Sequence, residues 1–272
     1  GKVIRSYSST DPVLKPDPAL HPKAYNRICE QDPTAPNCRM PLYWPAPQMV
    51  IATQEGMHRF SWDLHFQPIG PESLAASGAH GVPGHTYPEP NSPWAPPGHY
   101  TVRLTVDGTS YTQPLTLVLD PRVKTPAVAL AQLAQLSRET YDGAVASHAA
   151  WERARGLVKT LDAAGGADAA AFKAKVEAVA PAPKPRPAGF FFRRPAPTGP
   201  PTLNGVSGEL MDAAMAMQNA DVAPTAREIA ACTKARTRSQ QVMAEWRQLS
   251  TTGLAQLNAK RQAAGLAPIR IP

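Results

Sequence analysis

The sequence lacks the compact motifs that mark the commonest catalytic and nucleotide-binding sites. No GxSxG motif is present to expose a nucleophilic serine, and neither GxGxxG nor a P-loop is present to bind phosphate. The segment GVSGE at 205–209 is only superficially similar to a nucleophile motif, and we expect it to begin a helix. We therefore expect no catalytic residue, no cofactor and no enzymatic activity.

Histidines and cysteines are too scattered to predict a metal site. His80 and His85 share a glycine-rich loop, but no carboxylate or cysteine is placed beside them. His58 and His65 are seven residues apart on a predicted strand, so they would lie on opposite faces. We expect no metal, and a hydrolase that uses His80 or His85 is the weakest of the functions considered.

Long apolar runs and charged residues are also scarce. No run approaches the roughly 18 residues that a membrane span needs, so we expect no transmembrane segment. Charged residues make up 18% of the chain, and the net charge is +7. The positive excess lies in residues 126–272, because residues 1–125 hold ten basic and ten acidic side chains. A solvated surface is the favoured explanation. We expect no nucleic-acid partner, because FFFRR is the only cluster that combines aromatic and basic residues, and its prolines argue against a groove-tracking surface.

Only three cysteines are present, and two of them lie nine residues apart in a loop rich in proline, aspartate and asparagine. A disulfide between Cys29 and Cys38 would stabilise the fold by about 2–3 kcal/mol, and two unrelated thiols are the alternative. We favour the disulfide, and with it a periplasmic or extracellular location. Cys232 falls on a helical apolar stripe, where we expect a buried residue. A start at Gly1 is typical of a chain processed or cut from a longer one.

Proline, by contrast, is abundant, with 31 residues. The prolines crowd into residues 1–47, 83–97 and 181–201, and proline disfavours both helix interiors and central strands. We therefore expect ordered loops or arms in these regions, including an extended arm over residues 1–47. Tyr43 and Trp44 are expected to hold this arm against a neighbouring surface.

The region that follows the arm alternates apolar and polar residues, which is typical of strands with one buried face. In the stretch 49–66 the face expected to be buried consists of His58, Phe60, Trp62 and Leu64. The clearest hairpin carries Tyr100, Val102, Leu104 and Val106 on one strand and Leu115, Leu117 and Leu119 on the other. Asp107-Gly108 is expected to begin the turn, because glycine readily takes a positive φ. These strands predict a small antiparallel, immunoglobulin-like β-sandwich.

From Thr125 onward the apolar period becomes helical. Thr125 is expected to cap the first helix, Pro126 to occupy its first position and Gly165-Gly166 to end it. Later helices are expected around 169–180, around 210–217, and from a capping box of Thr225 and Glu228 to a stop at Gly265. Residues 125–272 therefore predict an antiparallel bundle of three or four helices.

The insert at residues 181–201 places three consecutive phenylalanines among prolines and basic residues. Burying these aromatic rings would contribute very roughly 5–8 kcal/mol before ordering costs. They could fill a gap in their own bundle, or they could enter a partner or a membrane interface while the arginines contact acidic groups or lipid phosphates. The external alternative is slightly favoured. The expected interaction residues are Phe190, Phe191, Phe192, Arg193, Arg194, Tyr43 and Trp44.

The chain resembles the C-terminal region of large secreted bacterial proteins with sortilin-type or sialidase-type (Asp-box) β-propellers. The resemblance is carried by GKVIRSYSS, GMHRFSWDLHF, PPGHYTVRLTVDGTSYTQPLTLVLDPRVKT and LAQLNAKRQAAGLAPI. It implies an immunoglobulin-like module followed by a helical bundle, exported from the cytoplasm. It transfers no catalytic residue, because glycosidase activity would belong to the propeller and this chain has no Asp-box repeats.

Together these features predict an α+β protein with a proline-rich arm (1–47), an immunoglobulin-like β-sandwich (48–124) and a helical bundle (125–272). The expected function is a structural or interaction subunit that docks onto other proteins of a larger assembly, in contact with a membrane surface. A photosynthetic reaction centre–antenna complex is one example of such an assembly. The alternative is an accessory carbohydrate-binding or stabilising module of a propeller-type glycosyl hydrolase, with glycan bound by Trp44, Trp62 or Trp94.

Overall fold

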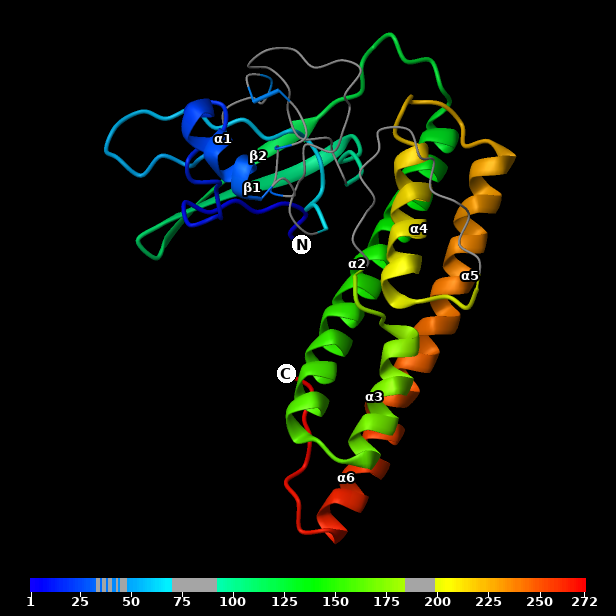
Figure 1. Ribbon diagram of the computed structural model, residues 1–272. Coiled ribbons are helices and arrows are strands. Elements are labelled where there is room, and N and C mark those ends of the chain that lie inside the picture. The colour runs from blue at the N-terminus through cyan, green and yellow to red at the C-terminus, as the bar shows by residue number, and fades with distance from the viewer. Residues whose placement is uncertain are drawn as a thin grey trace. The chain divides into compact units, whose positions relative to one another are not determined.

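The computed structural model describes residues 1–32, 35, 38, 41, 42, 44, 48–69, 92–183 and 199–272. The described residues belong to two compact units. The first lies in Gly1–Ser92, and the second comprises the described residues from Pro93 onward. Figure 1 shows several helices and one pair of strands, so the protein is α+β, as predicted.

The first unit contains the helix α1 (Pro22–Gln31), in which Tyr25 is buried. Proline at the first helical position costs no hydrogen bond, and the next proline in the chain is Pro33, beyond the end of the helix. The prediction that residues 1–47 form an extended arm without regular elements is therefore wrong here. The overall density of proline obscured a ten-residue stretch with no proline in its interior.

Two kinds of link hold the first unit together. Cys29 in α1 forms a disulfide with Cys38, which confirms the predicted pair. The carboxylate of Asp17 accepts hydrogen bonds from the backbone N–H groups of Ala19 (2.7 Å) and Gln48 (3.1 Å). The unit therefore depends on a covalent link and on polar contacts between distant parts of its chain.

No strand forms over residues 49–66, so the strand predicted there is wrong. Side chains bond to nearby backbone groups instead: Trp62 Nε1 donates to the carbonyl of His65 (3.0 Å), and the carboxylate of Asp63 accepts from the His65 N–H (3.1 Å). Leu64, between Asp63 and His65, has a φ of 62°, which is left-handed and incompatible with a strand. Leu64 is exposed and His65 is buried, the reverse of the predicted faces.

The predicted hairpin is confirmed in the second unit. Strand β1 (Gly98–Val106) pairs antiparallel with β2 (Thr109–Leu117), with Tyr100 opposite Leu115. Asp107 and Gly108 both have positive φ, 48° and 80°, as a type I′ turn requires. Among the described residues these two strands are the whole sheet, and no second sheet of a sandwich is present.

The helices of the second unit start with α2 (Ala127–Ala164). Pro126 is its N-cap and precedes the first helical residue, one position earlier than predicted. Thr125 does not cap the helix, because its hydroxyl donates to the carbonyl of Asp221. A hydrogen bond from the Thr125 side chain to the backbone of a remote segment therefore replaces the predicted local cap.

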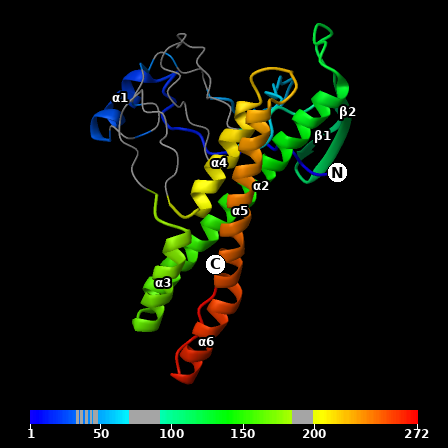
Figure 2. The same ribbon diagram turned by 90° about the vertical axis from the view of Figure 1, so that its right-hand side faces the viewer.

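The remaining helices are α3 (Ala167–Val179), α4 (Leu203–Ala216), α5 (Ala226–Gln248), the π-helical turn η1 (Leu249–Gly253) and α6 (Leu254–Ala263). Gly165 and Gly166 separate α2 from α3, as predicted. The capping box is confirmed: the Thr225 N–H donates to Glu228 Oε2 (2.7 Å), and the Glu228 N–H donates to Thr225 Oγ1 (3.3 Å). The turn η1 was not predicted. Helix α2 packs against α3, α4 and α5, and Figures 1 and 2 show these helices side by side.

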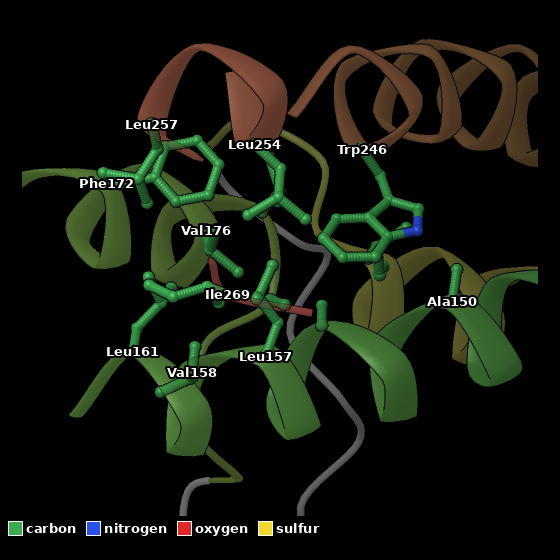
Figure 3. Packing of buried hydrophobic residues seen from close by; sticks show 14 of the residues in the cluster. Ala150, Leu157, Val158, Leu161, Phe172, Val176, Trp246, Leu254, Leu257 and Ile269 are labelled. Carbon is green, nitrogen blue, oxygen red and sulfur yellow. The ribbon is translucent and has the colours of Figure 1, made fainter. Parts of the chain in front are cut away.

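A buried apolar cluster joins α2, α3, α4, α5, α6 and the segment after α6, and Figure 3 shows part of it. Its large members include Leu157, Val158, Leu161, Phe172, Val176, Trp246, Leu254, Leu257 and Ile269. A smaller cluster contains Cys232 with Ala213 and Met217, so the predicted burial of Cys232 is confirmed. The helical part of the protein therefore has a conventional packed core.

Candidate docking surface

The hairpin β1–β2 has one apolar and one polar face, because side chains alternate along each strand and directly paired residues share a face. The apolar face carries the pairs Tyr100–Leu115, Val102–Gln113, Leu104–Tyr111 and Val106–Thr109. The polar face carries the pairs His99–Thr116, Thr101–Pro114, Arg103–Thr112 and Thr105–Ser110. The alternating pattern that predicted a buried sheet face is therefore present in the structure.

The apolar face of the hairpin is largely open to solvent. Val102, Leu104, Val106 and Tyr111 are between 49% and 59% exposed. Tyr100 and Leu115, at the base of the hairpin, are half-buried. An antiparallel sheet normally covers its apolar face with a second layer, and an exposed contiguous apolar patch marks an interaction site. We call these six residues the hairpin apolar face.

Hydrogen bonds fix the base of the hairpin. The Tyr100 hydroxyl donates to the carbonyl of Pro96 (2.5 Å), and burial raises the pKa of Tyr100, so it stays a neutral donor. The backbone N–H of Trp94 donates to Gln218 Oε1 (2.8 Å), and Gln218 Nε2 donates to Ser137 Oγ (2.9 Å). The segment that leads into β1 is therefore bonded to the helical part of the same unit.

Side chains on the polar face form hydrogen-bonding pairs across the two strands. His99 Nδ1 and Thr116 Oγ1 lie 3.2 Å apart, and the hydroxyls of Thr105 and Ser110 share a hydrogen bond of 2.9 Å. The hairpin can bury apolar area against a partner, or extend its ladder at the free edge of either strand, since neither has a further strand beside it among the described residues.

Most of the interaction residues predicted from the sequence lie outside the described residues. These are Tyr43, Phe190, Phe191, Phe192, Arg193 and Arg194, together with the loop histidines His80 and His85. Trp44 is described and half-buried, and its N–H donates to the carbonyl of Pro41 (2.9 Å). Of the tryptophans considered for glycan binding, Trp62 is half-buried and Trp94 is exposed.

Among the residues that the structure describes, no group of three or more His, Cys, Asp or Glu side chains is placed to hold a metal ion. None of the helices found in that part of the chain is long and apolar enough to cross a membrane.

Five of the six residues of the hairpin apolar face, all but Tyr111, were predicted from the sequence, but a second sheet was expected to cover them. The signal that could have corrected this is the poor quality of the other strand candidate, in which Trp62 and Asp63 favour local turns. When the sequence offers no second well-formed strand region, an alternating hairpin predicts an apolar face that another part of the chain or a partner must cover.

Comparison with known proteins gives no relative from which a function could be transferred. No family model matches this chain, and no match is found among curated proteins or among solved structures. The resemblance to the C-terminal region of propeller proteins therefore stays a prediction, and the candidate site rests on the geometry of the hairpin.

Proposed function

We propose that this protein is a non-enzymatic structural subunit that docks onto a larger assembly through the hairpin apolar face. The observation that carries the proposal is the exposure of Val102, Leu104 and Tyr111 on a face with the alternation of a buried sheet. Burying a large apolar side chain contributes about 1.5–3 kcal/mol, so covering this face supplies a substantial driving force for association. A two-stranded hairpin is marginal by itself, so a covering partner also stabilises the hairpin.

The location that we propose is periplasmic or extracellular. The disulfide between Cys29 and Cys38 supports this location, because disulfides form and persist in oxidising compartments. We place the subunit at the periphery of a membrane-bound assembly, of which a photosynthetic reaction centre–antenna complex is one example. The resemblance to exported propeller proteins is consistent with such a location.

We propose that the hairpin acts as one sheet of an immunoglobulin-like sandwich. One sheet of a sandwich buries its apolar face against the other sheet. We propose that the partner's surface takes the place of the second sheet over the hairpin apolar face. The aromatic-basic segment Phe190–Arg194 and the pair Tyr43 and Trp44 are proposed as further contacts, on the evidence of their composition.

The test is affinity capture from native membranes of the source organism, with three versions of the full chain. The first is wild type, and the second carries Val102→Thr, Leu104→Thr and Tyr111→Thr on the apolar face. The third is a matched control with Thr101→Ser, Thr105→Ser and Thr112→Ser on the exposed polar face. We expect the second version to lose a defined set of partners and the control to retain it, with equal helix content in all three.

Retention of the same partners by the apolar-face variant would contradict the proposal. A fourth version, with Phe190, Phe191 and Phe192 changed to Ser, then asks whether the insert is the docking element instead. Loss of partners only in this version would move the interaction from the hairpin to the insert.

The exposure of Trp94 supports the alternative of a carbohydrate-binding module, because an exposed indole can stack on a sugar ring. A glycan array probed with wild type and with Trp94→Ala distinguishes the two functions. Binding that is lost in Trp94→Ala would favour the carbohydrate-binding module. An array without signal would leave the docking subunit as the proposed function.

A further inference from the structure

A cavity of about 470 Å³ lies within the second unit. None of the residues that line it belongs to the hairpin. The cavity is formed by α2, α5, η1 and the C-terminal segment 264–272. The residues that matter for its chemistry are Arg153, Met243, Trp246, Arg247, Ile271 and Pro272. Its volume falls in the range of about 300–1,000 Å³ that is typical of small-molecule sites.

The C-terminal segment forms one wall of the cavity and is firmly attached. Asn258 Nδ2 donates to the carbonyl of Ile269 (2.9 Å), and the Ile269 N–H donates to Asn258 Oδ1 (2.7 Å). The side chain of Ile269 is buried in the apolar cluster. At Gly156 in α2 an added Cβ would lie 2.6 Å from Pro272 Cγ, so only glycine allows this close approach. The wall is therefore built by specific contacts.

Arg153 and Arg247 both line the cavity, and both side chains are exposed. Arg138, Arg155 and Arg238 each form an ion pair with an acidic side chain, at N–O distances between 2.8 and 3.6 Å. The guanidinium groups of Arg153 and Arg247 make no ion pair or hydrogen bond with the described residues. Two positive charges therefore border the same cavity, and its lining contains no acidic side chain.

Three apolar side chains form another part of the cavity wall. Met243 and Ile271 are half-buried, Trp246 is almost completely buried, and all three pack on the main apolar cluster. A ligand body placed here would continue the core of the bundle outward. Methionine adapts to varied ligand shapes because its side chain is unbranched and flexible.

The π-helical turn η1 borders the cavity and contributes Ser250 to its lining. Insertions of this kind occur frequently at functional sites. The hydroxyls of Ser250 (3.2 Å) and Thr251 (2.7 Å) both donate to the backbone carbonyl of Arg247. These bonds fix the backbone from which the Arg247 side chain extends.

We propose that this cavity binds a small amphipathic anion. Its carboxylate or phosphate group is held by Arg153 and Arg247, and its aliphatic or aromatic body lies against Met243, Trp246 and Ile271. The planar guanidinium group suits this role, because it donates two parallel hydrogen bonds to a carboxylate or phosphate. The proposal is independent of docking through the hairpin.

The test is calorimetric titration of the full chain with decanoate, at concentrations below those at which it forms micelles. Decanol supplies the same body without the charge, and inorganic phosphate supplies an anion without the body. The site variant is Arg153→Gln with Arg247→Gln. The matched control is Arg227→Gln with Lys234→Gln, which removes the same charge from exposed positions of α5 outside the cavity lining.

We expect wild type and the control to bind decanoate equally, and the site variant to bind it at least about tenfold more weakly. Decanol and phosphate should each bind wild type at least about tenfold more weakly than decanoate. A second readout on wild type needs no variant: decanoate should shift the NMR signals of Met243, Trp246 and Ile271 and leave those of the hairpin unchanged.

Three results would overturn the proposal. The first is no saturable binding of decanoate by wild type at millimolar concentration. The second is equal binding by wild type and the site variant. The third is phosphate binding as tight as that of decanoate, because the apolar walls would then contribute nothing.

Discussion

The helical bundle and the hairpin both have amphipathic sequences, but only the bundle buries its apolar side chains. In the bundle, Leu157 and Val176 from different helices meet in one cluster and are almost inaccessible to solvent. In the hairpin, Val102 and Leu104 occupy equally regular positions and remain half exposed. The comparison shows that an apolar pattern specifies which face needs covering, and that a second element of complementary shape must supply the cover. The first unit represents a third case, in which a disulfide and polar contacts link the chain.

The largest expected effect is on the core of the bundle. Leu157→Ala removes a completely buried side chain and should lower the free energy of unfolding by about 2–5 kcal/mol. Urea denaturation of the full chain, followed by helical circular dichroism, measures the change. The control is Val128→Ala on the same helix, where the side chain is exposed and the effect should stay within about 0.5 kcal/mol. Equal losses in the two variants would contradict the core described for α2.

The next effect concerns the first unit alone. Changing Cys29 and Cys38 together to Ser should lower the local stability around α1 by about 2–3 kcal/mol, because the short loop is no longer closed. Hydrogen exchange of the α1 amides measures this loss, and the helices of the second unit should keep their protection. Cys232→Ser provides the reverse control, because it alters the buried cluster of the bundle and leaves the disulfide intact. Loss of protection in both units after removal of the disulfide would show that the units are not independent.

A smaller effect depends on pH through Asp17. Burial by itself raises the pKa of this carboxyl, but hydrogen bonds from Gln48, Ala19 and Leu20 outweigh burial and lower the pKa below its ordinary value of 3.8. A lowered folded-state pKa contributes stability above the ordinary pKa, and this contribution is lost as the pH falls through the folded-state value. Asp17→Asn should therefore cost about 1 kcal/mol at pH 7, after allowance for solvent screening, and less at pH 3.

Exchange of the Gln48 backbone amide between pH 7 and pH 3 measures this contribution, because that amide donates to Asp17. Asp11→Asn is a suitable control, since the Asp11 carboxylate bonds locally to Ser8 and does not contact Gln48. A loss of protection in Asp17→Asn that is the same at both pH values would contradict the role of the ionised carboxylate.

The smallest effect is expected in the hairpin of the free chain. Leu104→Thr replaces a side chain that is already half exposed, and threonine suits a strand, so stability should change by less than about 0.5 kcal/mol. Thermal unfolding of the isolated protein measures this. Tyr100→Thr at the half-buried base is the contrast and should cost more, since it also removes the bond to Pro96. A large loss in Leu104→Thr would indicate that the chain itself covers this face.

Features set by neighbouring residues were predictable from the sequence. The capping box of Thr225 and Glu228 and the turn at Asp107-Gly108 each depend on the chemistry of a few adjacent residues. The disulfide also followed from the short spacing and the loop composition. Helix α1 was missed because proline content was averaged over too long a segment, although Pro22 at the first helical position was a usable signal.

Features set by distant contacts were not predictable. The π-helical turn η1 lies where Gly253 closely approaches Phe172. A Cβ added at Gly253 would lie 2.9 Å from the Phe172 ring, and no local pattern in the sequence predicts that contact. The sequence could not show that Arg153 of α2 and Arg247 of α5 line one cavity, because the two residues lie far apart along the chain. The exposure of the hairpin apolar face likewise depends on what the rest of the chain provides.

The most direct test of docking through the hairpin is hydrogen–deuterium exchange of β1 and β2, measured in the free chain and in the native assembly. The proposed function predicts fast exchange of the hairpin amides in the free protein and strong protection in the assembly. The amides around Leu157 should be protected equally in both states, because the core of the bundle does not depend on a partner. Equal exchange of the hairpin in the two states would contradict docking through this face.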